Sequence, residues 1–294
     1  MQKLVKCTFS MALIVFWSLT QASAEEPGVT PAELRSMALT GSYAFSHERD
    51  NPATEGIGRE ILRFQVDGLT QYALLLWPAG TVPEEGWPVV QFNHGFHPNP
   101  PLNGFNAAGE SDRPGDYYRE TVQAFAREGF AVIVPDFRGH NISQGADFTA
   151  RVPADAWYSR DAIACFLALE SISGLNLEQV YMLGHSMGGP ITVRAMIALG
   201  DRVRAGSVWS SAAVTFEEKS VINQAAFLLS PLSIQHSLED QSTPATHSLQ
   251  LADHMKLAGA GYQLKVHLGS DHLFTDKDFS AAVTTDVQWF QRHR

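Results

Sequence analysis

The sequence predicts an α/β fold, in which a mostly parallel sheet carries helices on both faces. From about residue 60 to residue 292, short apolar runs alternate with longer segments of helical spacing. The run at 130–135 (FAVIVP) is apolar throughout, which is typical of a parallel strand buried on both faces. No linker, internal repeat or low-complexity segment interrupts the pattern, so residues 25–294 are predicted to form a single domain.

The predicted sheet has eight strands, each a short apolar or β-branched run bounded by turn residues. They lie at 61–66, 72–77, 88–93, 130–135, 180–183, 205–209, 232–235 and 262–268. The first two are expected to form a hairpin through Asp67-Gly68-Leu69-Thr70. The later strands are separated by predicted helices, and such connections favour parallel pairing.

Helical periodicity accounts for the segments between the strands. In the helix predicted at 117–128, Tyr118, Val122 and Phe125 share one face. The other predicted helices lie at 153–171, 191–199, 249–257 and 279–292. Residues 25–58 show a short helical pattern at 31–34 and no other clear element.

Two segments depart from the alternation. Residues 97–116 form a long loop rich in Pro, Gly and Asn, and loops of that length in a compact domain are usually functional or mobile. Residues 212–231 form an insertion that ends in the apolar run Phe227-Leu228-Leu229. The insertion is either a core helix or a small lid over a pocket, and both readings stay open on the sequence.

Residues 1–24 are predicted to be a signal peptide. Lys3 and Lys6 form a basic start, an apolar stretch runs from about Met11 to Leu19, and Ala22-Ser23-Ala24 supplies the small residues of a cleavage site. The apolar stretch is shorter than the roughly 20 residues that a membrane-spanning helix needs. We therefore expect a secreted or periplasmic protein with no stable membrane anchor after cleavage.

Composition limits the partners and the redox chemistry. The net charge is −10 with 21 basic and 31 acidic residues, so loss of Lys3 and Lys6 would leave 21 − 2 = 19 basic residues and 19 − 31 = −12. No basic run is present, which argues against nucleic-acid binding. Cleavage would also remove Cys7, so Cys165, in an apolar run, is expected to be a buried structural thiol without a disulfide.

A candidate nucleophile lies between a predicted strand and a predicted helix. The pentapeptide Gly184-His185-Ser186-Met187-Gly188 fits the pattern G-x-S-x-G, which exposes a serine on a strained strand-to-helix turn. Gly184 and Gly188 suit such a turn because it leaves no space for a Cβ on either side of the serine. Ser186 is therefore predicted to be a catalytic nucleophile.

A serine needs a base, and His272 is the predicted one among eleven histidines. It follows the last predicted strand in the turn Gly269-Ser270-Asp271-His272, where a loop can bring it over the carboxyl edge of the sheet. The other histidines considered lie in the serine turn, after earlier strands or in predicted helices: His185, His94, His140, His254 and His293.

The third member of a triad must be a carboxylate between Ser186 and His272. Asp240 is predicted, because it follows the strand at 232–235 after a short turn and so lies at the edge where Ser186 lies. Glu239 is the alternative. The remaining candidates are adjacent to the base, inside a helix or in the insertion: Asp271, Asp253, Glu217 and Glu218.

Two backbone N–H groups are predicted to form an oxyanion hole. One belongs to Met187, the residue after the nucleophile. The other belongs to Phe96, in the loop Asn93-His94-Gly95-Phe96 that follows the third strand.

These motifs together resemble the α/β-hydrolase superfamily. The resemblance rests on the chain order Ser186…Asp240…His272 and on the segments GHSMGG, NHGF, PDFRGH (135–140) and HSLEDQSTP (236–244). It covers about residues 60–292 and is strongest to the prolyl oligopeptidase-like and dienelactone hydrolase-like branches. It implies an α/β-hydrolase catalytic domain over 25–294, with the acid at Asp240, the base at His272, and no cofactor or metal.

The departures from those branches shape the expected function. The chain has no counterpart of the propeller that filters peptides in prolyl oligopeptidases, and it has Ser186 where dienelactone hydrolases typically have cysteine. We expect a secreted serine hydrolase that cleaves small carboxylic esters. Two alternatives remain: a small serine peptidase, and a non-catalytic binding protein of the same fold, a kind that generally lacks a triad residue.

Overall fold

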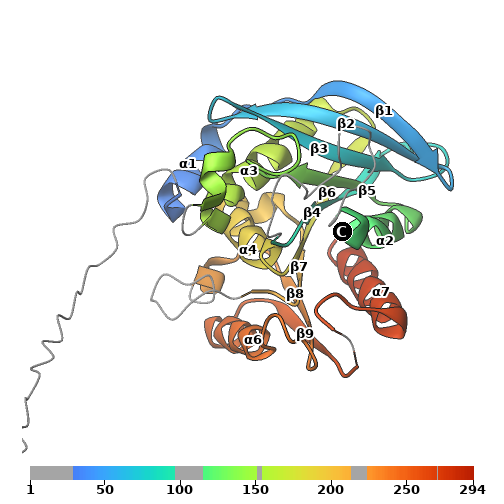
Figure 1. Cartoon of the computed structure of the whole chain (residues 1–294). Helices are drawn as coiled ribbons and strands as arrows, with labels where there is room; N and C mark the ends of the chain where they lie inside the picture. The colour runs from blue at the N-terminus through green and yellow to red at the C-terminus, as the bar shows by residue number, and fades with distance from the viewer. Residues whose placement is uncertain (1–28, 97–114, 151–153, 213–223, 270) are drawn as a thin grey trace, which may run out of the picture.

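The computed structural model describes residues 29–96, 115–150, 154–212, 224–269 and 271–294 (Figure 1). The predicted signal peptide lies outside the described residues. So do most of the long loop at 97–116 and most of the insertion at 212–231, including Glu217 and Glu218.

A single nine-stranded sheet forms the centre of the molecule, in the order β1-β2-β3-β5-β4-β6-β7-β8-β9. The strands are β1 (Ser46–Thr54), β2 (Ile57–Val66), β3 (Leu69–Trp77), β4 (Trp87–Asn93), β5 (Ala131–Asp136), β6 (Leu175–His185), β7 (Gly206–Trp209), β8 (Leu232–Ser237) and β9 (Tyr262–His267). β1, β2 and β3 pair antiparallel, β3 also pairs antiparallel with β5, and every pair from β5 to β9 is parallel. The predicted mostly parallel sheet is confirmed, with one strand more than the eight predicted.

The extra strand is β1, at the edge of the sheet. Its sequence, SHERDNPAT, is almost entirely polar and lacks the apolar alternation that marks a half-buried strand. Pairing with β2 holds it in place, through a turn in which both Glu55 and Gly56 have positive φ. Asp67 and Gly68, in the turn between β2 and β3, also both have positive φ, as the favoured two-residue hairpin turn requires.

Helices cover both faces of the sheet, as predicted (Figure 1). α1 (Pro31–Thr40), α3 (Ala154–Ala168), α4 (Gly188–Leu199) and α6 (Thr246–Ala258) contribute buried residues to one hydrophobic core. α2 (Gly115–Arg127) and α7 (Asp276–Arg292) contribute to a second core on the opposite face. Cys165 is a buried free thiol within α3, in agreement with the structural role expected for it.

The described end of the insertion is not a core helix. Ala225–Phe227 form a single 3₁₀ turn that lies against α6. Leu228 is buried in the core beside α4 and α6, whereas Phe227 and Leu229 are exposed. The lid reading concerns residues 213–223, outside the described part of the chain.

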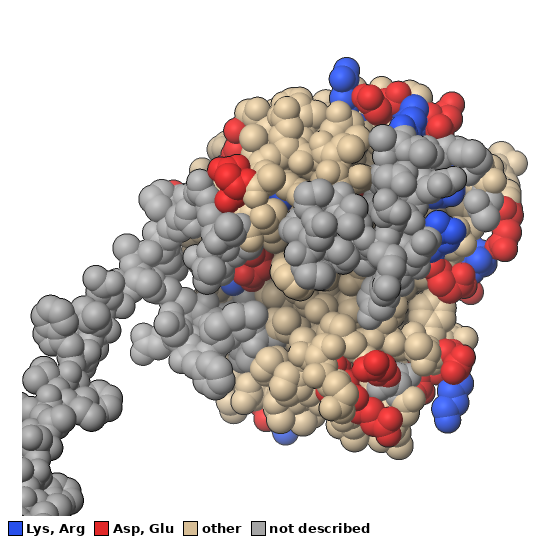
Figure 2. Space-filling model, viewed as in Figure 1, with Lys and Arg blue, Asp and Glu red and all other residues tan. Residues whose placement is uncertain are grey.

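Basic and acidic side chains are intermixed on the face shown in Figure 2, where both gather over β1, β2 and α2. Ion pairs in these elements include Arg63 with Glu48 and Arg127 with Glu120. Among the described residues, no helix combines the length and the apolar character needed to cross a bilayer.

Buried polar contacts fix α7 against the sheet. The fully buried Asp286 accepts hydrogen bonds from Trp209 Nε1 (2.6 Å), Ser233 Oγ (2.9 Å) and Gln235 Nε2 (2.7 Å). Trp289 Nε1 donates to the carbonyl of Gly206 at 3.1 Å. Because α7 follows the His272 loop directly, these contacts limit where that loop can lie.

The buried Asp286 predicts a pH-dependent contribution to stability. Burial raises the pKa of Asp286 to about 6, although its hydrogen bonds oppose the shift. Between the unfolded value near 3.9 and about 6, the folded protein binds this proton more tightly, so stability from this group increases as pH falls through 6. When the pH is lowered from 7 to 5, we expect the free energy of unfolding of wild type to increase by about 1 kcal/mol relative to that of Asp286→Asn.

Urea unfolding at the two pH values measures this difference, with Asp253→Asn, an exposed position on α6, as the matched control. An Asp286→Asn variant whose unfolding free energy follows that of wild type between pH 7 and pH 5 would contradict the assignment.

Candidate active site

Ser186 occupies a strained turn between β6 and α4. Its φ is +56°, a left-handed conformation that non-glycine residues seldom adopt. The turn is held by hydrogen bonds from Ser186 N–H to the carbonyl of Trp209 (3.0 Å) and from Gly189 N–H to the carbonyl of Ser186 (3.0 Å). The predicted strand-to-helix position of Ser186 is therefore what the structure shows.

The two glycines of the pentapeptide are required by close packing. A Cβ on Gly184 would lie 2.2 Å from the carbonyl oxygen of Gly188. A Cβ on Gly188 would lie 1.9 Å from the carbonyl oxygen of Asn93. Both distances are far below van der Waals contact, and backbone atoms cannot move aside as a flexible side chain can.

The structure brings Asp240 and His272 together. Asp240 follows β8, His272 follows β9, and Asp240 Oδ2 lies 2.8 Å from His272 Nδ1. The Asp240 side chain is inaccessible to solvent and that of His272 is 17% exposed. The alternative acid, Glu239, is exposed, as are Asp253 and Asp271. Burial and contact with His272 thus distinguish Asp240 from its neighbours.

The turn after β8 surrounds Asp240 with hydrogen-bond donors. Oδ1 accepts the backbone N–H groups of Ser242 (2.7 Å) and Thr243 (2.9 Å). Oδ2 lies 2.7 Å from the Thr243 hydroxyl and 3.2 Å from Nε2 of the buried His236. Burial opposes ionisation, but the hydrogen bonds from His272, Thr243 and Ser242 outweigh it and lower the pKa of Asp240 to about 2.

The His272 loop and the loop after β4 both reach the serine turn. The rings of His272 and His185 are 4.6 Å apart between centroids, and His185 directly precedes Ser186. On the other side, a Cβ on Gly95 would lie 3.1 Å from Cβ of Ser186. Five strand ends therefore meet here: those of β4, β6, β7, β8 and β9, as expected for the carboxyl edge of a parallel sheet.

The two predicted oxyanion donors belong to the loop after β4 and to the residue after Ser186. The N–H of Ser186 is bonded to Trp209, and that of Gly95 to the Tyr118 hydroxyl. Among the described residues, the backbone N–H groups of Phe96 and Met187 have no hydrogen-bond acceptor. Of these four N–H groups, those of Phe96 and Met187 can therefore donate a hydrogen bond to a bound anion.

Three further residues support the site and were not predicted from the sequence. Thr243 and His236 contact Asp240, and Tyr118 of α2 contacts both Gly95 and His185. The spacing of Asp240 and Thr243 was a usable signal, because an Asp side chain commonly accepts N–H groups two and three residues later. No local signal marks Tyr118, whose helix lies far from β6 in the sequence.

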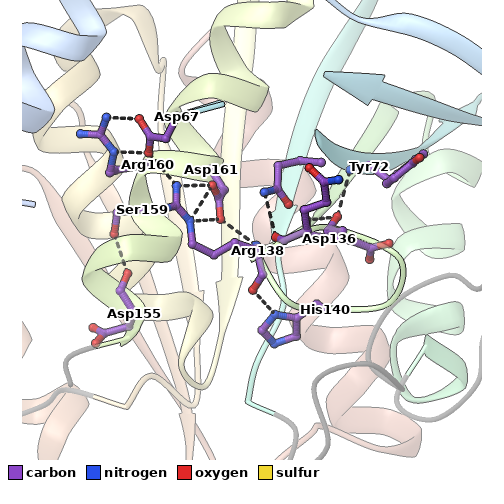
Figure 3. A network of polar contacts seen from close by, with 12 residues as sticks. Asp67, Tyr72, Asp136, Arg138, His140, Asp155, Ser159, Arg160 and Asp161 are labelled. Carbon is purple, nitrogen blue, oxygen red and sulfur yellow. Dashed lines mark hydrogen bonds and ion pairs between the residues drawn. The ribbon is translucent and has the colours of Figure 1, made fainter. Parts of the chain in front are cut away.

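A buried network holds the loop after β5 (Figure 3). The fully buried Arg138 contacts Asp161 of α3 through Nε and Nη2 and contacts Asp67 of the β2–β3 turn through Nη2 (2.9 Å). Its carbonyl lies 3.3 Å from His140 Nδ1. The PDFRGH segment therefore links β5, α3 and a hairpin turn, and Arg138 has a structural role.

One group of described residues has the composition of a metal site. His47, Asp50 and Glu60 approach one another on β1 and β2, at the edge of the sheet. His47 Nε2 lies 2.9 Å from Asp50 Oδ1, and Trp77 Nε1 donates to Glu60. These mutual hydrogen bonds explain the cluster without an ion.

Comparison with known families agrees with this geometry. The family described as serine aminopeptidase, S33, matches residues 113–286, which is more than half of the 294-residue chain. The chain belongs to this family. The matched range spans the positions of Ser186, Asp240 and His272, and the predicted α/β-hydrolase fold is confirmed. A search of curated protein sequences found no match.

Solved structures of similar fold include both peptidases and esterases. Porphyromonas gingivalis dipeptidyl peptidase 4 is 15% identical with a TM-score of 0.64; the alignment covers 84% of this chain and 36% of that one. Acetyl xylan esterase from Paenibacillus sp. R4 is 13% identical (TM-score 0.64; 90% and 93% covered). Est1E from Butyrivibrio proteoclasticus is 16% identical (TM-score 0.59; 79% and 98% covered). The chain therefore spans about a third of the peptidase but nearly the whole of either esterase.

Proposed function

We propose that the protein hydrolyses carboxylic esters through an acyl-enzyme on Ser186, with His272 as the base and Asp240 as its carboxylate partner. The observation that carries the proposal is the 2.8 Å contact between the buried Asp240 and His272, beside a serine with φ of +56°. A strained serine, an oriented histidine and free backbone donors are the components of acyl transfer.

The contacts of Asp240 define the proton positions that this mechanism needs. An ionised carboxylate only accepts hydrogen bonds, so His272 carries its proton on Nδ1 and has a lone pair on Nε2. Nε2 can then take the hydroxyl proton of Ser186 as Oγ attacks the ester carbonyl. The N–H groups of Phe96 and Met187 would stabilise the resulting oxyanion. Water would release the acyl group by the same steps.

The surroundings of the site favour an apolar ester. Leu238 and Leu268 follow β8 and β9 at the carboxyl edge of the sheet, and these residues are 53% and 74% exposed. Leu238 precedes Asp240 by two residues, and Leu268 precedes His272 by four. Exposed apolar residues in the turns that carry Asp240 and His272 suit an acyl chain or an aromatic group of a small ester.

A peptidase activity is the second candidate, because the matched family is described as serine aminopeptidase. A peptidase must protonate an amine leaving group and normally anchors a peptide terminus by charge. The adjacent carboxylates of the insertion, Glu217 and Glu218, could supply such an anchor, and they lie outside the described residues. The ester proposal needs no anchor beyond the groups described above.

A comparison of substrates tests the two activities. We expect kcat/KM on p-nitrophenyl butyrate to exceed that on Ala- and Gly-Pro-p-nitroanilides by at least about 100-fold, or about 2.7 kcal/mol of barrier. Ser186→Ala protein, purified in the same way, sets the background. A higher kcat/KM on either anilide would replace the esterase proposal with the peptidase one, and hydrolysis of none of them would favour a binding protein.

A further inference from the structure

A buried chain of hydrogen bonds links the loop after β4 to the backbone of His272. The N–H of Gly95 donates to the Tyr118 hydroxyl at 2.9 Å, and that hydroxyl lies 2.7 Å from His185 Nδ1. His185 Nε2 lies 3.0 Å from the carbonyl oxygen of His272. Tyr118 and His185 are both buried, so water does not compete for these contacts.

Each hydrogen bond in this chain has a defined direction. The His272 carbonyl can only accept, so His185 carries its proton on Nε2. Burial, and to a smaller extent the nearby His272, lowers the pKa of His185 to about 3, so the ring is neutral at physiological pH and Nδ1 is an acceptor. The Tyr118 hydroxyl therefore donates to Nδ1 while it accepts from Gly95.

The same loop fixes the direction of the Phe96 N–H. His94 Nδ1 lies 2.9 Å from the carbonyl oxygen of Gly95, which must be the acceptor. That carbonyl and the N–H of Phe96 belong to one planar peptide group and point in opposite directions. Tyr118 holds one side of Gly95 and His94 holds the other, so the two contacts together set the orientation of the Phe96 N–H.

We propose that Tyr118 and His185 are positioning residues that couple the Phe96 oxyanion donor to the backbone of His272. This inference rests on the proposed hydrolase function. A displacement of either loop would move the other through directed, buried hydrogen bonds. The oxyanion donor and the base would thus be held in one geometry, which matters most in the transition state.

Tyr118→Phe tests the coupling, because it removes the hydroxyl and keeps the ring against Phe92. We expect kcat on p-nitrophenyl butyrate to fall by about 10- to 100-fold with KM little changed, a smaller loss than the 10²–10³ reported for removal of a whole oxyanion donor. Tyr181→Phe is the matched control. Tyr181 is also buried, its hydroxyl has no hydrogen-bond partner among the described residues, and we expect wild-type kcat.

Substitutions of His185 separate positioning from packing. His185→Leu removes both hydrogen bonds, and we expect a loss in kcat similar to that of Tyr118→Phe. His185→Gln keeps one donor and one acceptor and should recover part of kcat. If the hydrogen bonds of Tyr118 and His185 act as a unit, the double variant Tyr118→Phe with His185→Leu should have a kcat no more than about 3-fold below that of either single variant.

The outcomes distinguish this inference from the proposed function. If wild type neither hydrolyses the ester nor reacts with a fluorophosphonate at Ser186, the proposed function fails. If wild type is active but folded Tyr118→Phe protein keeps wild-type kcat, the coupling is wrong. The coupling is also wrong if the change appears only in KM, or if the losses of the two single variants multiply in the double variant.

Discussion

Ser186→Ala and His272→Ala should each reduce kcat on p-nitrophenyl butyrate by about 10⁴- to 10⁶-fold while leaving the fold intact. Without its hydroxyl, Ser186 cannot form the acyl-enzyme, and without His272 no base accepts the hydroxyl proton. Because these groups act in one step, the double variant should be no slower than the worse single variant. Steady-state kinetics and circular dichroism measure both parts of this expectation.

Covalent labelling gives the same test without a substrate. A fluorophosphonate should modify wild-type protein once, at Ser186, and should leave Ser186→Ala unmodified. Ser280→Ala, at an exposed position on α7, is the control and should label normally. Labelling that persists in Ser186→Ala, or a His272→Ala variant with near-wild-type kcat, would remove Ser186 or His272 from the mechanism.

Asp240→Asn should lower kcat by roughly 10⁴-fold, by analogy with the Ser-His-Asp triad. The backbone N–H groups of Ser242 and Thr243 require an acceptor at the Oδ1 position, so the amide nitrogen of Asn would replace Oδ2. That nitrogen would donate to His272 Nδ1, and the proton of His272 would move to Nε2. The lone pair that should accept the hydroxyl proton of Ser186 would then be lost.

Glu239→Gln is the matched control for that substitution, one residue away. Glu239 is exposed, and its backbone N–H is bonded to the Ser237 hydroxyl at 3.1 Å, so the turn should keep its shape. We expect its kcat to stay within about 3-fold of wild type. If Glu239→Gln were the more damaging change, Glu239 rather than Asp240 would be the partner of His272.

The sequence by itself determined the features that depend on neighbouring residues. Apolar runs of strand length locate every strand from β2 to β9, because such strands are buried whatever their order in the sheet. The position of Ser186 is equally local: a strand, two glycines without room for a Cβ, and a helix start follow one another within a few residues. His272 was predictable because it follows the last strand.

Only the tertiary structure decided the features that depend on contacts between elements. Strand β1 has no apolar pattern of its own and is ordered by pairing with β2. Asp240 and Glu239 are adjacent and chemically alike, and the turn after β8 buries one on His272 and exposes the other. Tyr118, near the start of α2, contacts Gly95 after β4 and His185 at the end of β6. The contacts of Asp240 with His272 and of Tyr118 with His185 join residues far apart in the chain, and β1 has no periodicity of its own, so local sequence patterns do not reveal these features.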